Sequence, residues 1–148
     1  MEIASQKTTI MEKIKILISW SGDNYAAGTG EINGMVMATN KSLEGVKDSF
    51  KGAFEFHVES SLADGDELPA YIVEGNYELN YELQISALLH KLDGVITRAA
   101  LARVTGIDQR QLGHYLQGRR EPRPKTCKKI IHGIQQLGQE LAAVVVTR

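Results

Sequence analysis

Several short stretches in the N-terminal half alternate apolar and polar residues, a pattern typical of half-buried strands. Apolar side chains occupy every second position from Ile14 to Trp20, turn-forming residues follow at 21–24, and an extended stretch begins again at Tyr25. Another extended stretch runs from Gly34 to Thr39. These patterns predict a hairpin followed by a third antiparallel strand.

One helix and one further strand are predicted next. Ser42 can cap the helix because its side-chain oxygen can accept a hydrogen bond from a free amide, and apolar residues then recur at spacings of three and four as far as His57. Residues 63–66 and Pro69 end the helical pattern. Tyr77 to Ile85 alternates again, with one apolar and one acidic face. The N-terminal half therefore follows the order β-β-β-α-β.

From residue 86 onward the apolar spacing is helical. Caps and stop signals divide this region into four helices, and these signals are Asp93-Gly94, Thr97, Asp108 and Gly118. The last helix is expected to carry apolar residues from Cys127 to Val145. The predicted fold class is α+β, with a small antiparallel sheet and one helix followed by an all-α domain.

The net charge of −1 conceals two halves of opposite sign. Residues 1–83 hold 6 Lys and no Arg against 4 Asp and 10 Glu, a net charge of −8. Residues 84–148 hold 4 Lys and 7 Arg against 2 Asp and 2 Glu, a net charge of +7. A basic half suits the phosphate backbone of a nucleic acid and an acidic half suits a basic protein, so we predict domains at 12–83 and 84–148. The alternative is chance segregation of solvated charges.

Composition excludes several protein classes. The chain has 148 residues, 43% apolar and 24% charged, which is typical of a globular protein. Its apolar runs are too short to span a bilayer, and no secretory signal opens it, so we expect no membrane association. The single cysteine, Cys127, has no partner for a disulfide or a zinc site. We therefore expect a cytoplasmic protein without a metal or another cofactor.

The segment from Thr97 to Gly118 has the features of a helix-turn-helix. It has a small residue, Ala102, where two helices would cross, a glycine turn at Gly106 and apolar residues on one face only. With Pro122 and Pro124 beyond, it resembles the Cro/repressor-type helix-turn-helix. This resemblance implies a domain that binds operator double-stranded DNA, and a purely structural helical hairpin is the alternative.

Polar side chains on and around the second of these helices are the candidate DNA-binding residues. Gln suits adenine and Arg suits guanine because each offers two groups in one plane, whereas His offers a single donor or acceptor. The candidates for base readout are Gln109, Arg110, Gln111, His114 and Gln117. Flanking candidates, mainly for phosphate contact, are Thr97, Arg98, Arg119, Arg120, Arg123 and Lys125. The alternative for each is a solvated surface that reads no bases.

The N-terminal half resembles the HicB antitoxin family. The resemblance rests on Ile14–Trp20, Tyr25–Ala27, Ile32–Val36, Ala38–Thr39 and Ser42–Glu44, followed by a helix through Phe54 and His57. It implies a partial ribonuclease H-like fold joined to a DNA-binding domain. It also implies that the chain neutralises a small basic mRNA-cleaving toxin, HicA, and represses its own operon. The alternative is a transcription regulator whose N-terminal domain senses a ligand or oligomerises.

Catalysis is not expected of this fold. A two-metal nuclease needs converging carboxylates, and in the ribonuclease H arrangement one comes from the first strand, whereas the strand predicted from Ile14 has none. We therefore expect no catalytic residues and no enzyme. Trp20 and Tyr25 are candidate anchors for the toxin because aromatic residues dominate interface energies, and core packing explains them equally well.

A homodimer or a higher homo-oligomer is expected from the last predicted helix, because its apolar surface is wider than one small domain needs. The apolar residues are Ile130, Ile131, Ile134, Leu137, Leu141, Val144, Val145 and Val146. Repressors of the helix-turn-helix type also bind paired half-sites, which requires two-fold symmetry.

Overall fold

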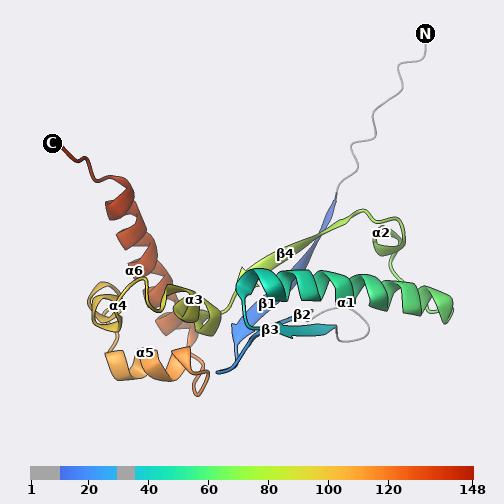
Figure 1. The fold of residues 1–148 in the computed structure, drawn as a ribbon, viewed down its shortest axis with the longest axis horizontal. Coiled ribbons are helices and arrows are strands. Elements are labelled where there is room, and N and C mark those ends of the chain that lie inside the picture. Colours follow the sequence, from blue (N-terminus) through green and yellow to red (C-terminus); the bar gives the residue numbers. More distant parts are fainter. Residues whose placement is uncertain (1–10, 30–35) are drawn as a thin grey trace, which may run out of the picture. The chain divides into compact units, whose positions relative to one another are not determined.

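The structure is a computed structural model that describes residues 11–29 and 36–148, and it divides into two compact units (Figure 1). Within the described residues, the first unit comprises 11–18, 26–29 and 36–82, and the second comprises 19–25 and 83–148. The predicted domains, 12–83 and 84–148, remain an expectation, and the structure groups residues 19–25 with the C-terminal helices. Whether either domain folds alone stays a prediction.

The first unit is built on a four-stranded sheet. Its strands are β1 (Glu12–Trp20), β2 (Tyr25–Thr29), β3 (Met37–Asn40) and β4 (Tyr77–Leu83), in the order β3-β2-β1-β4. The α+β class and the β1–β2 hairpin are as predicted. The predicted third strand is shorter than expected, since β3 begins at Met37. The first two residues predicted for it, 34 and 35, lie outside the described part of the chain, as do residues 32–35 of the HicB resemblance.

The fourth strand joins the sheet in parallel with β1. The Glu12 amide donates to the Asn76 carbonyl oxygen (3.0 Å), and farther along the same two strands Lys15 pairs with Glu82 (N to O, 3.1 Å). Residue numbers therefore rise together along the two strands, which makes the sheet mixed rather than wholly antiparallel. The connection from β3 at one edge to β4 at the other runs through the helix α1 (Leu43–Ala63).

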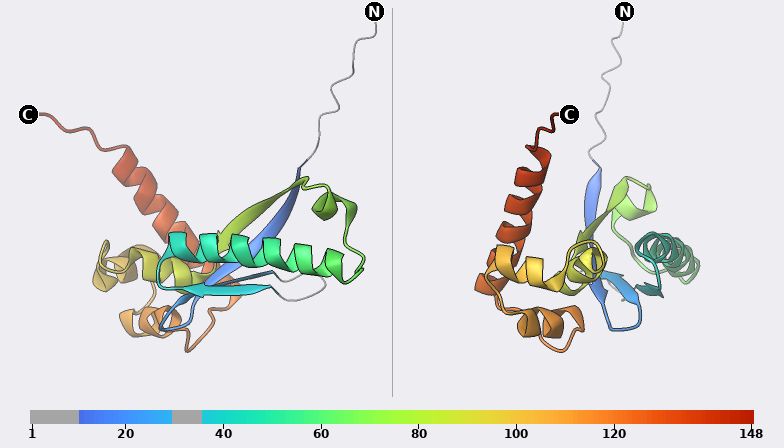
Figure 2. Two further views of the ribbon diagram at one scale, coloured as in Figure 1. Left: turned by 45° about the vertical axis from the view of Figure 1, so that its right-hand side comes forward. Right: turned by 60° about the vertical axis from the view of Figure 1, so that its left-hand side comes forward.

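Helix α1 covers one face of the sheet (Figure 2). As predicted, it begins after Ser42, whose hydroxyl oxygen accepts a hydrogen bond from the Gly45 amide (3.0 Å). Its buried stripe includes Val46, Phe50 and Phe54, which form the core of this unit together with the alternating isoleucines of β1. A four-residue helix, α2 (Ala70–Val73), was not expected, and it buries Ile72.

Strand β1 begins two residues earlier than predicted, at Glu12. The expectation that the first strand carries no carboxylate is therefore wrong, because pairing with Asn76 extends the strand to this residue. Glu12 is exposed. Within residues 11–29 and 36–148, no three His, Cys, Asp or Glu side chains are grouped so that they could hold a metal ion.

Four helices form most of the second unit: α3 (Ile85–Leu92), α4 (Arg98–Thr105), α5 (Gln109–Leu116) and α6 (Pro124–Ala142). Ile85 was predicted in the preceding strand and instead begins α3. Helix α3 packs against α5, and α4 packs against both α5 and α6. The shared core consists of Leu89, Leu101, Ile107, Leu112, Tyr115 and Ile130. None of the described helices is long and apolar enough to cross a membrane.

The last helix ends at Ala142, earlier than predicted. Val144, Val145 and Val146 therefore lie beyond the helix and not on its apolar face. Three consecutive β-branched residues lose side-chain freedom in a helix, which accounts for the earlier end.

An aromatic cluster explains why residues 19–25 group with the helices. The indole of Trp20 stacks on the imidazole of His90 in α3, with ring centroids 3.5 Å apart and planes 6° apart. Tyr25 meets the Trp20 ring edge-on at 5.0 Å. The Trp20 amide also donates to the hydroxyl oxygen of Ser86 (3.0 Å). These contacts join the hairpin turn to α3 within the second unit.

Candidate nucleic-acid interface

Helices α4 and α5 are joined by a three-residue turn whose geometry is set by local hydrogen bonds. The Thr97 hydroxyl oxygen accepts from the Ala100 amide (3.1 Å) at the start of α4, as predicted. Gly106 ends α4 with φ 71°, a left-handed conformation that favours glycine, and its amide donates to the Ala102 carbonyl (2.9 Å). The Asp108 carboxylate then caps α5 by accepting from the Arg110 amide (3.2 Å).

Buried side chains fix the angle between the two helices. Leu101 of α4 and Leu112 and Tyr115 of α5 are each at most 5% exposed. The buried Thr105 hydroxyl donates to the Leu101 carbonyl (2.6 Å) and accepts from the Ile107 amide (3.3 Å), so no polar atom of this side chain is left unpaired. The prediction that the apolar residues of the pair lie on one inward face is confirmed for Leu101, Leu112 and Tyr115.

The sequence pattern did not reveal that Gly133 of α6 lies very close to the backbone of α4. A side chain at Gly133 of α6 would place its Cβ 2.9 Å from the Val104 carbonyl carbon and 3.0 Å from the Thr105 Cα. Ala102, where the crossing was predicted, is only half-buried. A glycine inside an otherwise good helical pattern was the available signal, since such a residue lowers helix stability and often has a packing reason, although the pattern does not distinguish Gly133 from Gly138 of the same helix.

The first residues of α5 form its exposed face. Gln109, Arg110 and Gln111 are all exposed, whereas Leu112 and Gly113 turn inward. His114 is half-buried, one turn farther along. In helix-turn-helix complexes the N-terminal residues of the second helix contact base edges, and three of the five predicted base readers lie at those positions. Gln117 is exposed and follows the last residue of α5. Base readout by these residues stays a prediction.

The predicted phosphate-binding cations surround α5. Arg98 is exposed, and its guanidinium extends over Gly113 of α5, 3.1 Å from where a Cβ would lie. The others follow α5 in the loop and at the start of α6, and all are exposed: Arg119, Arg120, Arg123 and Lys125. No salt bridge to these five cations is found within the described residues. They are therefore available to neutralise phosphates.

The two predicted toxin anchors, Trp20 and Tyr25, lie outside the helix-turn-helix, at the ends of β1 and β2. Tyr25 is 5% exposed, and burial raises the pKa of its phenol. Trp20 is half-buried and stacks on His90. Both residues therefore have a packing role inside the second unit, and their binding of a partner stays a prediction.

Comparison with known proteins finds a family match for one region of the chain. Residues 96–135 match the family model described as helix-turn-helix, of the Cro/C1 type. The match begins just before α4 and ends within α6, and it supports a DNA-binding transcription regulator. No curated protein and no solved structure matches the chain.

Removing the α5 cap should destabilise the helical unit modestly. Asp108→Ala deletes the acceptor for the Arg110 amide, and such a loss costs about 0.5–2 kcal/mol in the free energy of unfolding. Urea denaturation followed by circular dichroism measures this change. Asp93→Ala is the control, because the Asp93 side chain caps no helix start. An equal loss in both variants would contradict a specific role for the cap.

Proposed function

We propose that this chain is an antitoxin that neutralises a HicA-like mRNA-cleaving toxin and represses its own operon through the helix-turn-helix. The main support for the proposal is that one chain contains an acidic unit and a basic unit, and that the basic unit contains the helix-turn-helix. Residues 1–18 and 26–82 carry a net charge of −7, and residues 19–25 and 83–148 carry +6. An acidic unit suits a basic RNA-binding toxin, and a basic unit suits DNA.

The arrangement of the first unit also supports the antitoxin role. Three strands, a helix and a fourth strand have the order β-β-β-α-β that the sequence pattern predicted for the half of the chain that resembles the HicB family. The proposal includes no catalytic activity, no cofactor and a cytoplasmic location.

On DNA, the proposed geometry places α5 in the major groove. Gln109, Arg110 and Gln111 would contact base edges, while cations such as Arg98 and Arg119 would contact phosphates on either side. Phosphate contacts give affinity and register, and the base contacts give sequence preference.

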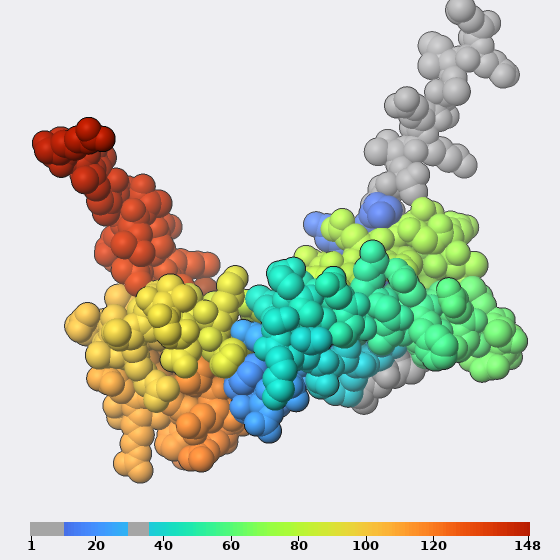
Figure 3. All heavy atoms as spheres, in the orientation of Figure 1, coloured from blue at the N-terminus to red at the C-terminus, as the bar shows by residue number. Residues whose placement is uncertain are grey.

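A homodimer fits this function, with α6 as the contact between copies. Leu141 is 63% exposed and Ile131 is 41% exposed, and the C-terminal part of α6 extends away from the other helices of its unit (Figure 3). Binding two half-sites about one DNA turn apart would require the two-fold symmetry that such a dimer supplies.

Leu141→Glu should therefore weaken dimerisation and, with it, operator affinity. A charge at the centre of an apolar contact loses its hydration without gaining a partner, and we expect a shift towards monomer at micromolar concentration. Sedimentation equilibrium measures the shift, with Gln136→Glu on the same helix as the control. A monomeric wild-type chain with unchanged DNA affinity in Leu141→Glu would exclude this dimer.

Co-expression tests the antitoxin role. The full chain is expressed with the basic protein encoded beside it, and we expect the two proteins to copurify and the chain to restore growth that the basic protein alone arrests. Arg110→Ala should still restore growth while repressing a reporter operon less strongly. If no protein copurifies and repression responds to a small molecule instead, the ligand-sensing regulator is the better assignment.

A further inference from the structure

Strand β4 is an open edge of the sheet. It pairs with β1 on one side, and within the described residues no other strand pairs with its outer side. The Glu12 amide donates to the Asn76 carbonyl oxygen, so the backbone polar groups of residue 76 point towards β1. Successive residues of a strand turn these groups to opposite sides, so those of residues 77, 79 and 81 point away from β1. Such a row of unpaired amides and carbonyls is a template for another strand.

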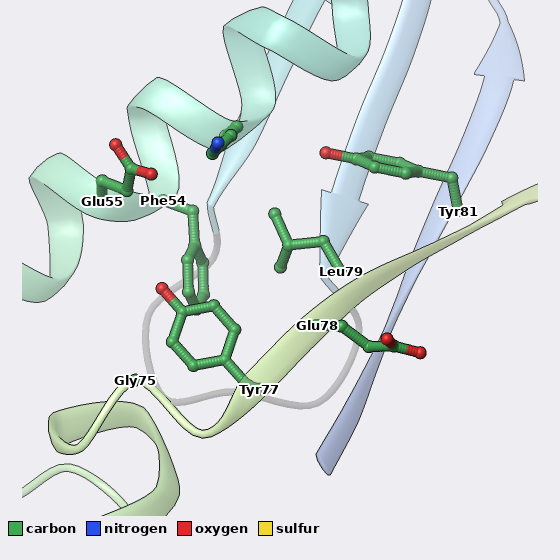
Figure 4. A pocket seen from close by; sticks show the side chains of 8 residues that line it. Phe54, Glu55, Gly75, Tyr77, Glu78, Leu79 and Tyr81 are labelled. Atoms are coloured by element: carbon green, nitrogen blue, oxygen red, sulfur yellow. The ribbon is translucent and has the colours of Figure 1, made fainter. Parts of the chain in front are cut away.

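A groove lies along the same edge, on the face covered by α1. It encloses about 440 Å³ and is lined from α1 by Lys51, Phe54 and Glu55 and from the β4 side by Gly75, Tyr77, Glu78, Leu79 and Tyr81. Figure 4 shows Tyr77, Leu79 and Tyr81 directed towards α1, while Glu78 points to the other side of β4. The side chains of an added strand alternate in direction, so every second one would enter this groove.

The walls of the groove are held in place by aromatic contacts. The Tyr77 and Phe54 rings meet edge-on with centroids 5.3 Å apart. The Tyr81 ring meets Phe50 in the same way at 6.3 Å, and its hydroxyl donates to the Lys47 carbonyl (3.1 Å). These contacts fix the rings before any partner arrives, which lowers the entropy cost of binding.

The charge of the first unit indicates what the groove would accept. The unit carries −7, and Glu55 at the groove forms no salt bridge within the described residues. Burial raises the pKa of the Tyr77 phenol, and the nearby Glu55 carboxylate raises it further. A carboxylate beside aromatic rings suits a Lys or Arg side chain, whose aliphatic stem packs on the rings while its cation meets the carboxylate.

We infer that an extended basic segment of a partner protein adds a strand to β4 and places alternate side chains in the groove between α1 and β4. Main-chain hydrogen bonds would give affinity, and the groove would select the side chains. The inference rests on the proposed function, because the partner is then the basic toxin and the segment is part of it.

Amide hydrogen exchange of the full chain, alone and with the co-expressed basic protein, tests the pairing. The amides of Tyr77, Leu79 and Tyr81 should become protected in the complex. Protection that appears in the chain alone and rises with its concentration would identify a second copy as the occupant and overturn the inference. A complex without protection on β4 would overturn it while leaving the antitoxin role intact. If no complex forms, both proposals fail.

A charge-reversal pair tests the groove. Glu55→Lys places a cation at the groove and should weaken the affinity for the basic protein about tenfold or more in calorimetry. Glu67→Lys makes the same charge change in an exposed loop that does not line the groove, and it should change the affinity much less. Both positions are exposed, so both variants should fold, which circular dichroism checks. Equal weakening by the two variants would leave only general electrostatic attraction and would overturn the groove as the site.

Discussion

Arg110→Ala should weaken binding to the DNA upstream of the chain's own coding sequence by about 1–3 kcal/mol, or roughly 5- to 150-fold. Arg110 is exposed on the first turn of α5, where helix-turn-helix proteins contact bases, and a guanidinium can bond to two acceptors of guanine. Binding to a random duplex of the same length should fall much less, because base contacts are the part that carries sequence information.

Two further arginine variants separate base readout from general charge. Arg119→Ala should weaken binding to both duplexes and reduce the slope of log affinity against log salt by about one, because one phosphate contact is lost. Arg148→Ala removes the same charge at the C-terminal end, remote from α5 in Figure 1, and should have little effect. Fluorescence anisotropy at several salt concentrations measures all three variants. Equal losses on both duplexes for Arg110→Ala would remove it from the base-reading residues.

Gly133→Ala should destabilise the helical unit by about 1–3 kcal/mol, although alanine is the better helix former. The new Cβ would lie 2.9 Å from the Val104 carbonyl carbon, and backbone atoms on α4 cannot rotate aside as a side chain would. Helix α6 must therefore shift away from α4, which loosens the packing around Ile130. For a unit of this size, each kcal/mol lowers Tm by about 4–8 °C.

Gly138→Ala supplies a control on the same helix. Apart from its chain neighbours and the nearby backbone of its own helix, no atom lies within 4 Å of the position its Cβ would take. Only the helix propensity therefore changes, and the chain should gain up to about 1 kcal/mol. Thermal unfolding followed by circular dichroism compares the two variants. Destabilisation by Gly138→Ala, or stabilisation by Gly133→Ala, would show that the contact between α4 and α6 is not as tight as described.

The features that local chemistry determines could be predicted from the sequence. Ser42, Thr97 and Asp108 cap the helices that follow them, because a cap depends only on a side chain and the amides two or three residues away. The alternation in β1 and β4 identified both strands and their buried faces. The same local rules placed Gln109, Arg110 and Gln111 on the exposed face of α5.

Features that depend on distant residues could not be predicted in this way. The parallel pairing of β4 with β1 and the close approach at Gly133 each join segments far apart in the chain. The groove between α1 and β4 also arises only when Phe54 and Tyr77 come together. The pattern of a single segment contains no information about its partner, so these features needed the folded structure.

The stacking of Trp20 on His90 bears on how such a protein can evolve. The chain passes between the two units three times, after residues 18, 25 and 82, instead of once. A recombination event near residue 83 would give the helical unit a new companion but would leave Trp20 behind, exposing the face of His90 that the indole covers. Exchange of the first unit would therefore succeed more readily when the hairpin turn is inherited along with the helices, so descendants of such an exchange should retain an aromatic residue at the position of Trp20.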